Sequence, residues 1–477
     1  MNANIHSSLA MEAPPMGEPI AIQALSWKQG LFLTAGAVTA FHLAYAFPPL
    51  GFLIILYLHC LFQLAALPTP RKAFYFGLIA GYAVYAPPLT FFWRIFGWPA
   101  IVLWTVLAFW LGLFVALARL CRSRFGRLAV VLVPLVWVGL EYFRSEVYYL
   151  RFSWLNVGCA FSCSPQVFSA THLGMYGVAL ALMLAVAPLS LLSKTRARIG
   201  LSVCVFALGC LVNLPAGPEA APSPKAVRVA GLQMEFPAEL ELPGALDKLV
   251  ARHPEAELLV LSEYTFDGPV SDRVKAWCRQ HQKYLIVGGK DWISGTDFFN
   301  TAFVVGPDGE VVFRQVKSVP IQFFKDGRPA GERRVWGSPW GRLGICVCYD
   351  LSYRRVTDDL IRQGAQAIIA PTMDVADWGE YQHRLHARVG PVRAAEYGVP
   401  IFRVCSSGIS QLINRSGRVV ASAAFPGEQE TIAGSFEPAE KGQLPLDAWL
   451  APISLCGTAA MILWLLGKAV LGKCSKP

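Results

Sequence analysis

The sequence is poor in charged residues. Asp, Glu, Lys and Arg make up only 16% of its 477 residues, whereas about a quarter is usual for a soluble domain. Hydrophobic residues make up 54% of the chain, and the mean hydropathy is +0.43. This composition excludes an enzyme that is water-soluble throughout, so part of the chain must lie in lipid.

Other sequence signals are also missing. The first 25 residues lack a basic segment followed by an apolar one, so they do not resemble a cleaved signal peptide, and we expect a polar tail. The cysteines lie mostly in or beside apolar segments, which predicts no disulfide framework. His383 and His386, near Asp374 and Asp377, lack a convincing ligand spacing, so we interpret these histidines as solvated or hydrogen-bonded. We therefore expect neither a metal nor another cofactor.

Apolar segments of about 20 residues, long enough to cross a hydrocarbon core of ~30 Å, dominate the first half of the chain. We predict seven membrane-spanning helices within residues 26–215 and an eighth at 446–471. The seven predicted spans are 27–46, 49–67, 73–92, 98–120, 126–145, 166–192 and 197–215.

Positive charge marks the orientation of these helices. The basic residues beside the first seven predicted spans are Lys28, Arg71, Lys72, Arg119, Arg122, Arg124, Arg127, Lys194, Arg196 and Arg198. Loops rich in Lys and Arg face the cytoplasm. This orientation accounts for much of the net charge of +10, and we expect no nucleic-acid partner. Seven spans then place the next domain on the outer side, and the eighth returns the C-terminal tail, so both termini are expected in the cytoplasm.

Residues 222–440 have the composition of a globular domain in which strand-like and helix-like segments alternate. This pattern predicts a layered α/β domain. The predicted strands are 226–234, 256–263, 283–291, 301–306, 310–316, 342–350, 365–372, 399–405 and 408–413, and the predicted helices are 245–253, 271–282, 356–364 and 383–398. The predicted fold is thus a multi-pass helical membrane domain plus an α/β domain.

Three reactive residues lie at the carboxyl ends of predicted strands of this domain: Glu263, Lys317 and Cys348. Since α/β enzymes keep their sites at the carboxyl ends of strands, we expect these side chains at one rim of a sheet. A carboxylate, an amine and a thiol together can deprotonate a nucleophile, stabilise an oxyanion and form an acyl intermediate. The Lys317 cation is expected to lower the pKa of the thiol. Cys346 lies within the same predicted strand as Cys348, and we assign it to packing.

The segments "LSE" (261–263), "VK" (316–317) and "GICVCYD" (344–350) resemble the glutamate, lysine and cysteine motifs of the nitrilase superfamily, the carbon–nitrogen hydrolases. The resemblance implies an αββα sandwich. It also implies that Cys348 is the nucleophile, Glu263 the general base and Lys317 the oxyanion stabiliser, with the Tyr349 N–H as a second oxyanion donor. Asp350 completes the cysteine motif, and we expect it on the substrate side of the site.

Seven spans before such a domain and one after it resemble the bacterial apolipoprotein N-acyltransferases over nearly the whole chain. This resemblance implies a multi-pass protein of the bacterial inner membrane, with the catalytic domain on the periplasmic side. It implies that Cys348 takes an acyl chain from a phospholipid as a thioester. The acyl chain then passes to the amino group of a diacylglyceryl-cysteine apolipoprotein. We expect the enzyme to act as a monomer.

Two further segments carry this resemblance. "EYFRSEVYYLRFSWLNVG" (141–158) is predicted on the outer side, where Glu141, Arg144 and Trp154 belong either to an aromatic belt with solvated charges or to a floor for lipid. Segment 370–410 contains Trp378, which either packs in a loop or forms a wall of the acyl site. In the loop 320–331, Phe323 and Phe324 are expected at the lipid interface.

The sequence also departs from the family. The family has a second glutamate soon after the lysine, whereas this chain has "PIQFFKDG" there. Glu332 or Asp326 could replace that glutamate, or Gln322 could orient the lysine without charge. The alternative functions are a membrane-anchored amidase that uses the same three residues and a catalytically silent scaffold, which the intact triad disfavours.

Overall fold

The computed structural model describes residues 24–214 and 226–474. The predicted polar tail, 1–25, lies almost entirely outside this range. So does the predicted boundary between the helical and α/β domains, near residues 215–222.

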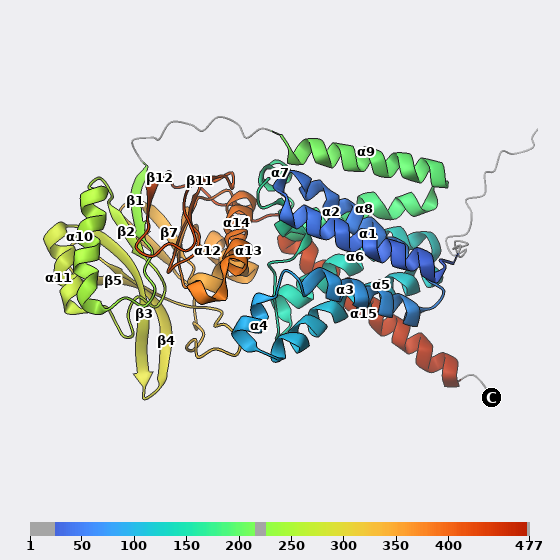
Figure 1. The fold of residues 1–477 in the computed structure, drawn as a ribbon, viewed down its shortest axis with the longest axis horizontal. Helices are drawn as coiled ribbons and strands as arrows, with labels where there is room; N and C mark the ends of the chain where they lie inside the picture. Colours follow the sequence, from blue (N-terminus) through green and yellow to red (C-terminus); the bar gives the residue numbers. More distant parts are fainter. Residues whose placement is uncertain (1–23, 215–225, 475–477) are drawn as a thin grey trace, which may run out of the picture.

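The N-terminal part consists of helices that run along one another (Figure 1). Its helices are α1 (Trp27–Ala46), α2 (Ile54–Leu64), α3 (Pro70–Tyr85), α4 (Phe91–Phe96), α5 (Pro99–Phe125), α6 (Ala129–Tyr142), α7 (Gln166–Thr171), α8 (Gly174–Val186) and α9 (Lys194–Val212). The long C-terminal helix α15 (Asp447–Cys474) packs on α6 and α8. A capping box of Ser26 and Gln29 starts α1, because it satisfies N–H groups that the first turn leaves free.

Glycines allow close packing within this part. A Cβ at Gly81 of α3 would lie 2.6 Å from the Cα of Ala108 in α5, and one at Gly77 would lie 2.9 Å from the Cα of Gly112. Small residues that let helix backbones approach closely are typical of helix contacts in membranes. Lipid tails are as apolar as side chains, so hydrophobic burial does not drive helices together there, whereas close packing does.

Four stretches of the described residues are long and apolar enough to cross a membrane: 99–147, 174–191, 194–212 and 447–468. The first contains both α5 and α6, which pack against each other. The chain is therefore a membrane protein with several long apolar helices, whereas the exact number of spans, eight, stays a prediction.

The second part is built on two six-stranded sheets. In spatial order, the first sheet contains β12 (Thr431–Phe436), β1 (Val227–Leu232), β2 (Leu258–Leu261), β3 (Tyr284–Ser294), β4 (Asp297–Val305) and β5 (Val311–Val316). The second contains β11 (Val419–Ala423), β10 (Ser410–Ile413), β9 (Ile401–Cys405), β8 (Ala367–Thr372), β7 (Gly341–Ile345) and β6 (Val335–Ser338).

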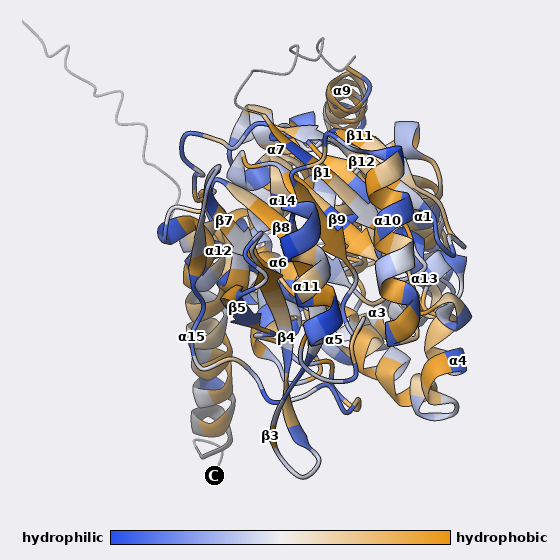
Figure 2. Cartoon of the chain, turned by 90° about the vertical axis from the view of Figure 1, so that its left-hand side faces the viewer, coloured by the Kyte–Doolittle hydropathy of each residue, from blue (hydrophilic) through white to orange (hydrophobic). Residues whose placement is uncertain are grey.

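Helices cover both outer faces of this pair of sheets. Helices α10 (Leu242–Arg252) and α11 (Asp272–His281) lie on the first sheet, at the end of the molecule that faces the viewer in Figure 2. Helices α12 (Arg354–Arg362), α13 (Glu380–Ala387) and α14 (Val389–Tyr397) lie between the second sheet and the N-terminal helices (Figure 1). The expected αββα sandwich beside a helical membrane part is confirmed.

Strand β2 shows why the sheets sandwich. Its side chains alternate, so Leu259 and Leu261 pack in the core under α10 and α11, while Leu258 and Val260 belong to the core that includes the second sheet. All four are buried. A strand that is apolar on both faces must be covered on both, and the two layers supply that cover.

The structure corrects some element boundaries. The predicted helix 383–398 is two helices, because Pro391 has no N–H to donate to the carbonyl of Ala387, where α13 ends. Strand β7 ends at Ile345, so Cys346 lies just beyond it. Strands β6, β11 and β12 were not expected. All three lie at sheet edges, where many of their side chains are exposed, so their sequences contain fewer consecutive apolar residues.

Buried charges join the two parts. Arg354 of α12 forms ion pairs with Asp447 at the start of α15 and with Asp358 at 3.1 Å. The carboxylate of Glu396 in α14 accepts from the Met175 N–H of α8 at 3.1 Å. These contacts hold the α/β domain in a fixed position on the helices.

Candidate active site

The loops that follow three strands bring Glu263, Lys317 and Cys348 together. Glu263 follows β2 and Lys317 follows β5, which are in the first sheet, whereas Cys348 follows β7 of the second sheet. The expected meeting at the rim of one sheet is therefore wrong in detail, because the site lies across the ends of two packed sheets.

Lys317 lies at the centre of a buried ion cluster. Its Nζ is 2.8 Å from Oε1 of Glu263 and 2.7 Å from Oδ2 of Asp326, and none of the Lys317 side chain is exposed. The amide Nδ2 of Asn300, on β4, donates to both carboxylates, at 2.6 and 2.8 Å. Two negative charges and one positive charge thus share a dry site, and each has hydrogen-bond partners, as burial requires.

Three residues were candidates to replace the family's second glutamate, and Asp326 is the one beside Lys317. Besides Lys317, it accepts from the Tyr264 hydroxyl at 2.7 Å and from the Ile321 N–H at 2.7 Å. Of the other candidates, Glu332 is exposed and pairs with Arg334, and Gln322 donates to the Tyr149 carbonyl. Of the three candidates, Asp326 is therefore the one that contacts the Lys317 ammonium.

Cys348 occupies a strained turn directly after the second sheet. Its φ is +52°, a left-handed conformation that is rare for a residue with a side chain and that often marks functional sites. Its Sγ lies 3.5 Å from the carbonyl oxygen of Met373, whose own N–H donates to Oε2 of Glu263 at 2.9 Å. One peptide chain segment thus aligns the thiol with the carboxylate.

The electrostatics leave the thiol protonated at rest. Burial and the Glu263 charge raise the pKa of Cys348 well above its usual value, and Lys317 only partly offsets them. Burial also raises the pKa of Glu263, against the opposing effect of Lys317. Burial alone would lower the pKa of Lys317, but Asp326 and Glu263 raise it, so the ammonium stays charged. Lys317 thus lowers the thiol pKa as expected, but burial and the Glu263 charge outweigh its effect, so the net shift is upward.

Cys346 and Asp350 flank this turn on its inner side. Cys346 is fully buried in the apolar core. The carboxylate of Asp350 accepts from the N–H groups of Ser318, Val319 and Val347, so it ties the segment after Lys317 to the cysteine turn. Asp350 was predicted at the substrate side, but the structure gives it a positioning contact instead.

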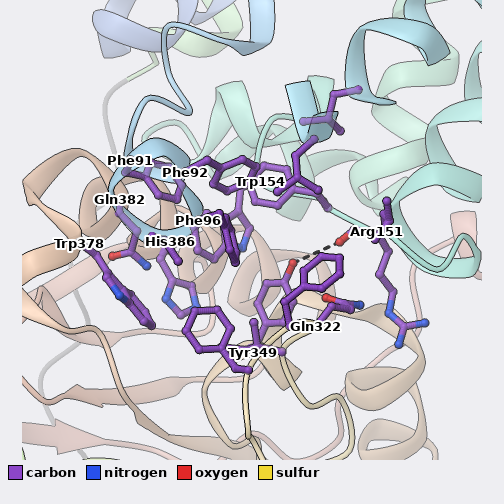
Figure 3. A pocket seen from close by; sticks show the side chains of 18 of the residues that line it. Phe91, Phe92, Phe96, Arg151, Trp154, Gln322, Tyr349, Trp378, Gln382 and His386 are labelled. Atoms are coloured by element: carbon purple, nitrogen blue, oxygen red, sulfur yellow. Dashed lines mark hydrogen bonds between the residues drawn. The ribbon is translucent and has the colours of Figure 1, made fainter. Parts of the chain in front are cut away.

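Cys348 lies in the lining of an apolar pocket, whose aromatic wall is shown in Figure 3. Phe91, Phe92 and Phe96, in and beside α4, and Trp154 line it from the helical part. From the α/β domain come Tyr349, Phe323, Phe324, Trp378, Gln382 and His386, among others. Phe323 and Phe324 pack edge-on against Phe96, with ring centroids 6.1 and 5.8 Å away, so the loop 320–331 closes over this pocket.

The two predicted tryptophans both line this pocket. Trp154 donates its indole N–H to the Ser352 hydroxyl at 3.0 Å and stacks on His386, with ring centroids 4.6 Å apart. Trp378 lies edge-on to Phe324 at 6.0 Å. Of the two interpretations of Trp378, the wall of the pocket agrees with its position.

Glu141 and Arg144, in contrast, lie away from the pocket. Glu141 accepts from the Val157 N–H at 2.9 Å, and Arg144 donates to the Phe152 carbonyl at 3.1 Å and to Oδ1 of Asn156 at 2.7 Å. Both side chains are buried. They are neither solvated nor a floor for lipid. They fold the loop that carries Trp154.

A polar cluster beside the nucleophile was not assigned a role from the sequence. Oδ1 of Asp374 lies 2.8 Å from Nδ1 of His386, and its other oxygen accepts from Arg403. Burial alone would raise the pKa of Asp374, but His386 and Arg403 hold it well below its usual range. Burial lowers the pKa of His386. His386 Nε2 is buried with no hydrogen-bond partner among the described residues. Of the two interpretations of these histidines, solvated or hydrogen-bonded, the second agrees with the structure: both are buried, and His383 bonds to the Val375 carbonyl as His386 does to Asp374.

The comparisons divide the chain as the structure does. The profile of the apolipoprotein N-acyltransferase N-terminal domain matches residues 39–211, and that of carbon-nitrogen hydrolases matches residues 210–442. An apolipoprotein N-acyltransferase from Geobacter metallireducens is 24% identical over 416 residues, which are 73% of this chain and 78% of that protein. One from Allorhizobium ampelinum is 25% identical over 84% of this chain and 89% of its own length.

Among solved structures, a carbon-nitrogen hydrolase from Helicobacter pylori G27 is similar, with 17% identity and a TM-score of 0.40 over 45% of this chain and 89% of that one. Two profiles thus adjoin across residues 39–442, and the relatives match along both parts. This chain belongs to the apolipoprotein N-acyltransferase family.

Proposed function

We propose that this protein is an acyltransferase that moves an acyl chain from a phospholipid to the N-terminal amino group of a diacylglyceryl-cysteine apolipoprotein, through a thioester on Cys348. The observation that carries this proposal is an apolar pocket that has Cys348 in its lining and is lined from both parts of the chain. A soluble amidase needs no such wall of helices, whereas a lipid acyl chain needs an apolar path to the nucleophile.

In the first half-reaction, Glu263 removes the proton from Cys348 as Sγ attacks the ester carbonyl of the phospholipid. The carbonyl oxygen becomes an oxyanion that faces the Lys317 ammonium and the Tyr349 N–H. Losing one such donor typically costs ~10²–10³ in rate. When the C–O bond breaks, protonated Glu263 returns its proton to the leaving alkoxide, and a lysophospholipid departs. A neutral thiol at rest suits this sequence, because Glu263 supplies the base at the moment of attack.

In the second half-reaction, the amine nitrogen of the apolipoprotein attacks the thioester carbonyl. Glu263 takes a proton from that nitrogen and passes it to Sγ as the C–S bond breaks, which yields the amide and the free thiol. The same two donors stabilise the second oxyanion. Two substrates that use one nucleophile in turn give ping-pong kinetics.

The thioester must survive between these steps. Cys348 is only 2% exposed, and the pocket that it lines is walled mainly by aromatic and aliphatic side chains. Excluding water in this way prevents hydrolysis of a reactive intermediate. The closed loop 320–331 therefore supports transfer over hydrolysis.

The predicted orientation agrees with how the helices are arranged. The Leu25 N–H bonds to the Ala66 carbonyl, and Arg119 donates to the carbonyls of Leu67 and Pro68. Basic loops far apart in the sequence thus meet at one end of the helices, and α15 runs away from the α/β domain (Figure 1). A reporter enzyme fused after Pro224 is expected to behave as periplasmic. Cytoplasmic behaviour would contradict the orientation and the function together.

The test of function uses the purified full chain in detergent with a fluorescent phospholipid and a diacylated lipopeptide. N-acylated lipopeptide and lysophospholipid are the expected products. Absence of that product, together with ammonia released from small amides, would instead support the membrane-anchored amidase.

A further inference from the structure

A polar cleft adjoins the apolar pocket and shares part of its wall. Its volume is about 610 Å³. Arg151, Ile321, Gln322, Phe323 and Phe324 line both spaces. An amphiphile that fills both would therefore lay its apolar part towards Cys348 and its polar part in the cleft.

The lining of the cleft carries positive charge and no acidic side chain. Its lining includes Arg151, Arg333 and Arg355 and no Asp or Glu. Arg333 is neutralised by Asp359, to which it donates at 2.8 Å. Among the described residues, neither Arg151 nor Arg355 forms an ion pair. Neither guanidinium therefore has a direct carboxylate partner in that part of the chain, although the buried Glu146 charge acts on Arg355 from a distance.

The guanidinium groups of Arg151 and Arg355 share an aromatic neighbour and are electrostatically coupled. Both approach the Tyr353 ring, at 5.4 Å for Arg151 and 5.6 Å for Arg355. Burial and the charge of Arg151 lower the pKa of Arg355. Placing like charges together is unfavourable unless an anion comes between them.

Two residues that line the cleft also carry unused hydrogen-bond donors. Nε of Arg151 and the hydroxyl of Ser318 are buried without a partner among the described residues, and both residues line the cleft. Guanidinium groups recognise phosphate through several parallel N–H bonds. A phosphate in the cleft would satisfy these donors.

The position of Arg151 is linked to the nucleophile. The hydroxyls of Tyr349 and Tyr353 both donate to the Arg151 carbonyl, at 3.3 and 3.5 Å. Figure 3 shows the first of these bonds, with the Arg151 guanidinium pointing away from the labelled aromatic side chains of the apolar pocket. The residue directly after Cys348 therefore holds Arg151, and Ser318 directly follows Lys317.

We propose that Arg151 and Arg355, with the Ser318 hydroxyl, bind the phosphodiester of the donor phospholipid while its acyl chain lies in the apolar pocket. This inference rests on the proposed function, since it assigns the headgroup end of the same donor. A phosphate held there places the nearby ester carbonyl at the cysteine.

The experiment compares two acyl donors in acylation of Cys348 in the full chain, without an acceptor. One donor is a phospholipid, and the other is p-nitrophenyl palmitate, which has no phosphate. We expect Arg355→Gln to lower the ratio of kcat/KM for phospholipid to kcat/KM for the ester about ten- to hundredfold, the effect of one charged hydrogen bond. Arg151→Gln should act in the same direction.

Arg334→Gln is the matched control, because it removes the same charge from an exposed side chain outside the cleft. Its ratio should equal that of the wild type. A wild-type ratio in both Arg355→Gln and Arg151→Gln would overturn the headgroup site. If the wild type forms no acyl-enzyme from phospholipid but does so from the ester, the proposed function itself fails.

Discussion

Removing the buried cation of the site has a calculable effect. In Lys317→Met, the carboxylates of Glu263 and Asp326 lose an ammonium that lies 2.8 and 2.7 Å away, with no solvent to replace it. Breaking a buried ion pair typically costs about 3–5 kcal/mol, which corresponds to a decrease of about 6–20 °C in melting temperature for a domain of this size. Acyl-enzyme formation should also fall at least ~10²-fold, since one oxyanion donor is lost.

The stability loss should depend on pH. Without Lys317, the one group that bonds both Glu263 and Asp326 is the neutral Asn300 amide, and no cation lies between the two carboxylates. One carboxylate therefore takes up a proton, and its folded-state pKa exceeds the unfolded value. The folded variant then binds more protons than the unfolded chain, so its stability decreases as pH rises through that raised pKa. The deficit relative to the wild type should thus be larger at about pH 8 than at about pH 5.5.

The assay is thermal unfolding of the full chain in detergent. Arg228→Met is the control, because Arg228 pairs with Glu257 at 3.4 Å on the exposed surface of the same domain, where ion pairs contribute little. The double variant Lys317→Met/Asp326→Asn should recover part of the loss, since only one buried carboxylate remains. A melting temperature of Lys317→Met no lower than that of the control, or a deficit that does not shrink in acid, would refute this reasoning.

Three other predictions concern the nucleophile and its base. Mass spectrometry should find the acyl adduct in Cys346→Ser but not in Cys348→Ser, and an adduct on Cys346 would reverse the assignment. Gly288→Ala should slow acyl-enzyme formation, because its Cβ would lie 2.5 Å from the Cα of Glu263, whereas Gly337→Ala, with no atom within 4 Å, should not. Alkylation of Cys348 by iodoacetamide should keep increasing above the ordinary thiol pKa of about 8.5, because burial and Glu263 raise the thiol pKa, and rapid alkylation in mild acid would contradict this.

Local patterns in the sequence predicted much of this molecule. Apolar runs predicted the helices, and most strands followed from short apolar segments between turns. The position of Cys348 after a strand, with Tyr349 and Asp350 next, separated it from Cys346. These features depend on residues close together in the chain, whose geometry a helix or strand determines directly.

The partners of the catalytic groups could not be predicted in this way. Asp326, rather than Glu332 or Gln322, contacts Lys317 because the loop after β5 turns its carboxylate inward.

The sequence by itself thus determined the membrane character, the α/β layers and the choice of Cys348 as the proposed nucleophile, because periodicity and motifs are local. Only the tertiary structure decided the rest: that two sheets share the site, that α4 lines the pocket, and that His386 meets Asp374. Those contacts join segments far apart in the chain, and their geometry arises only when the layers pack.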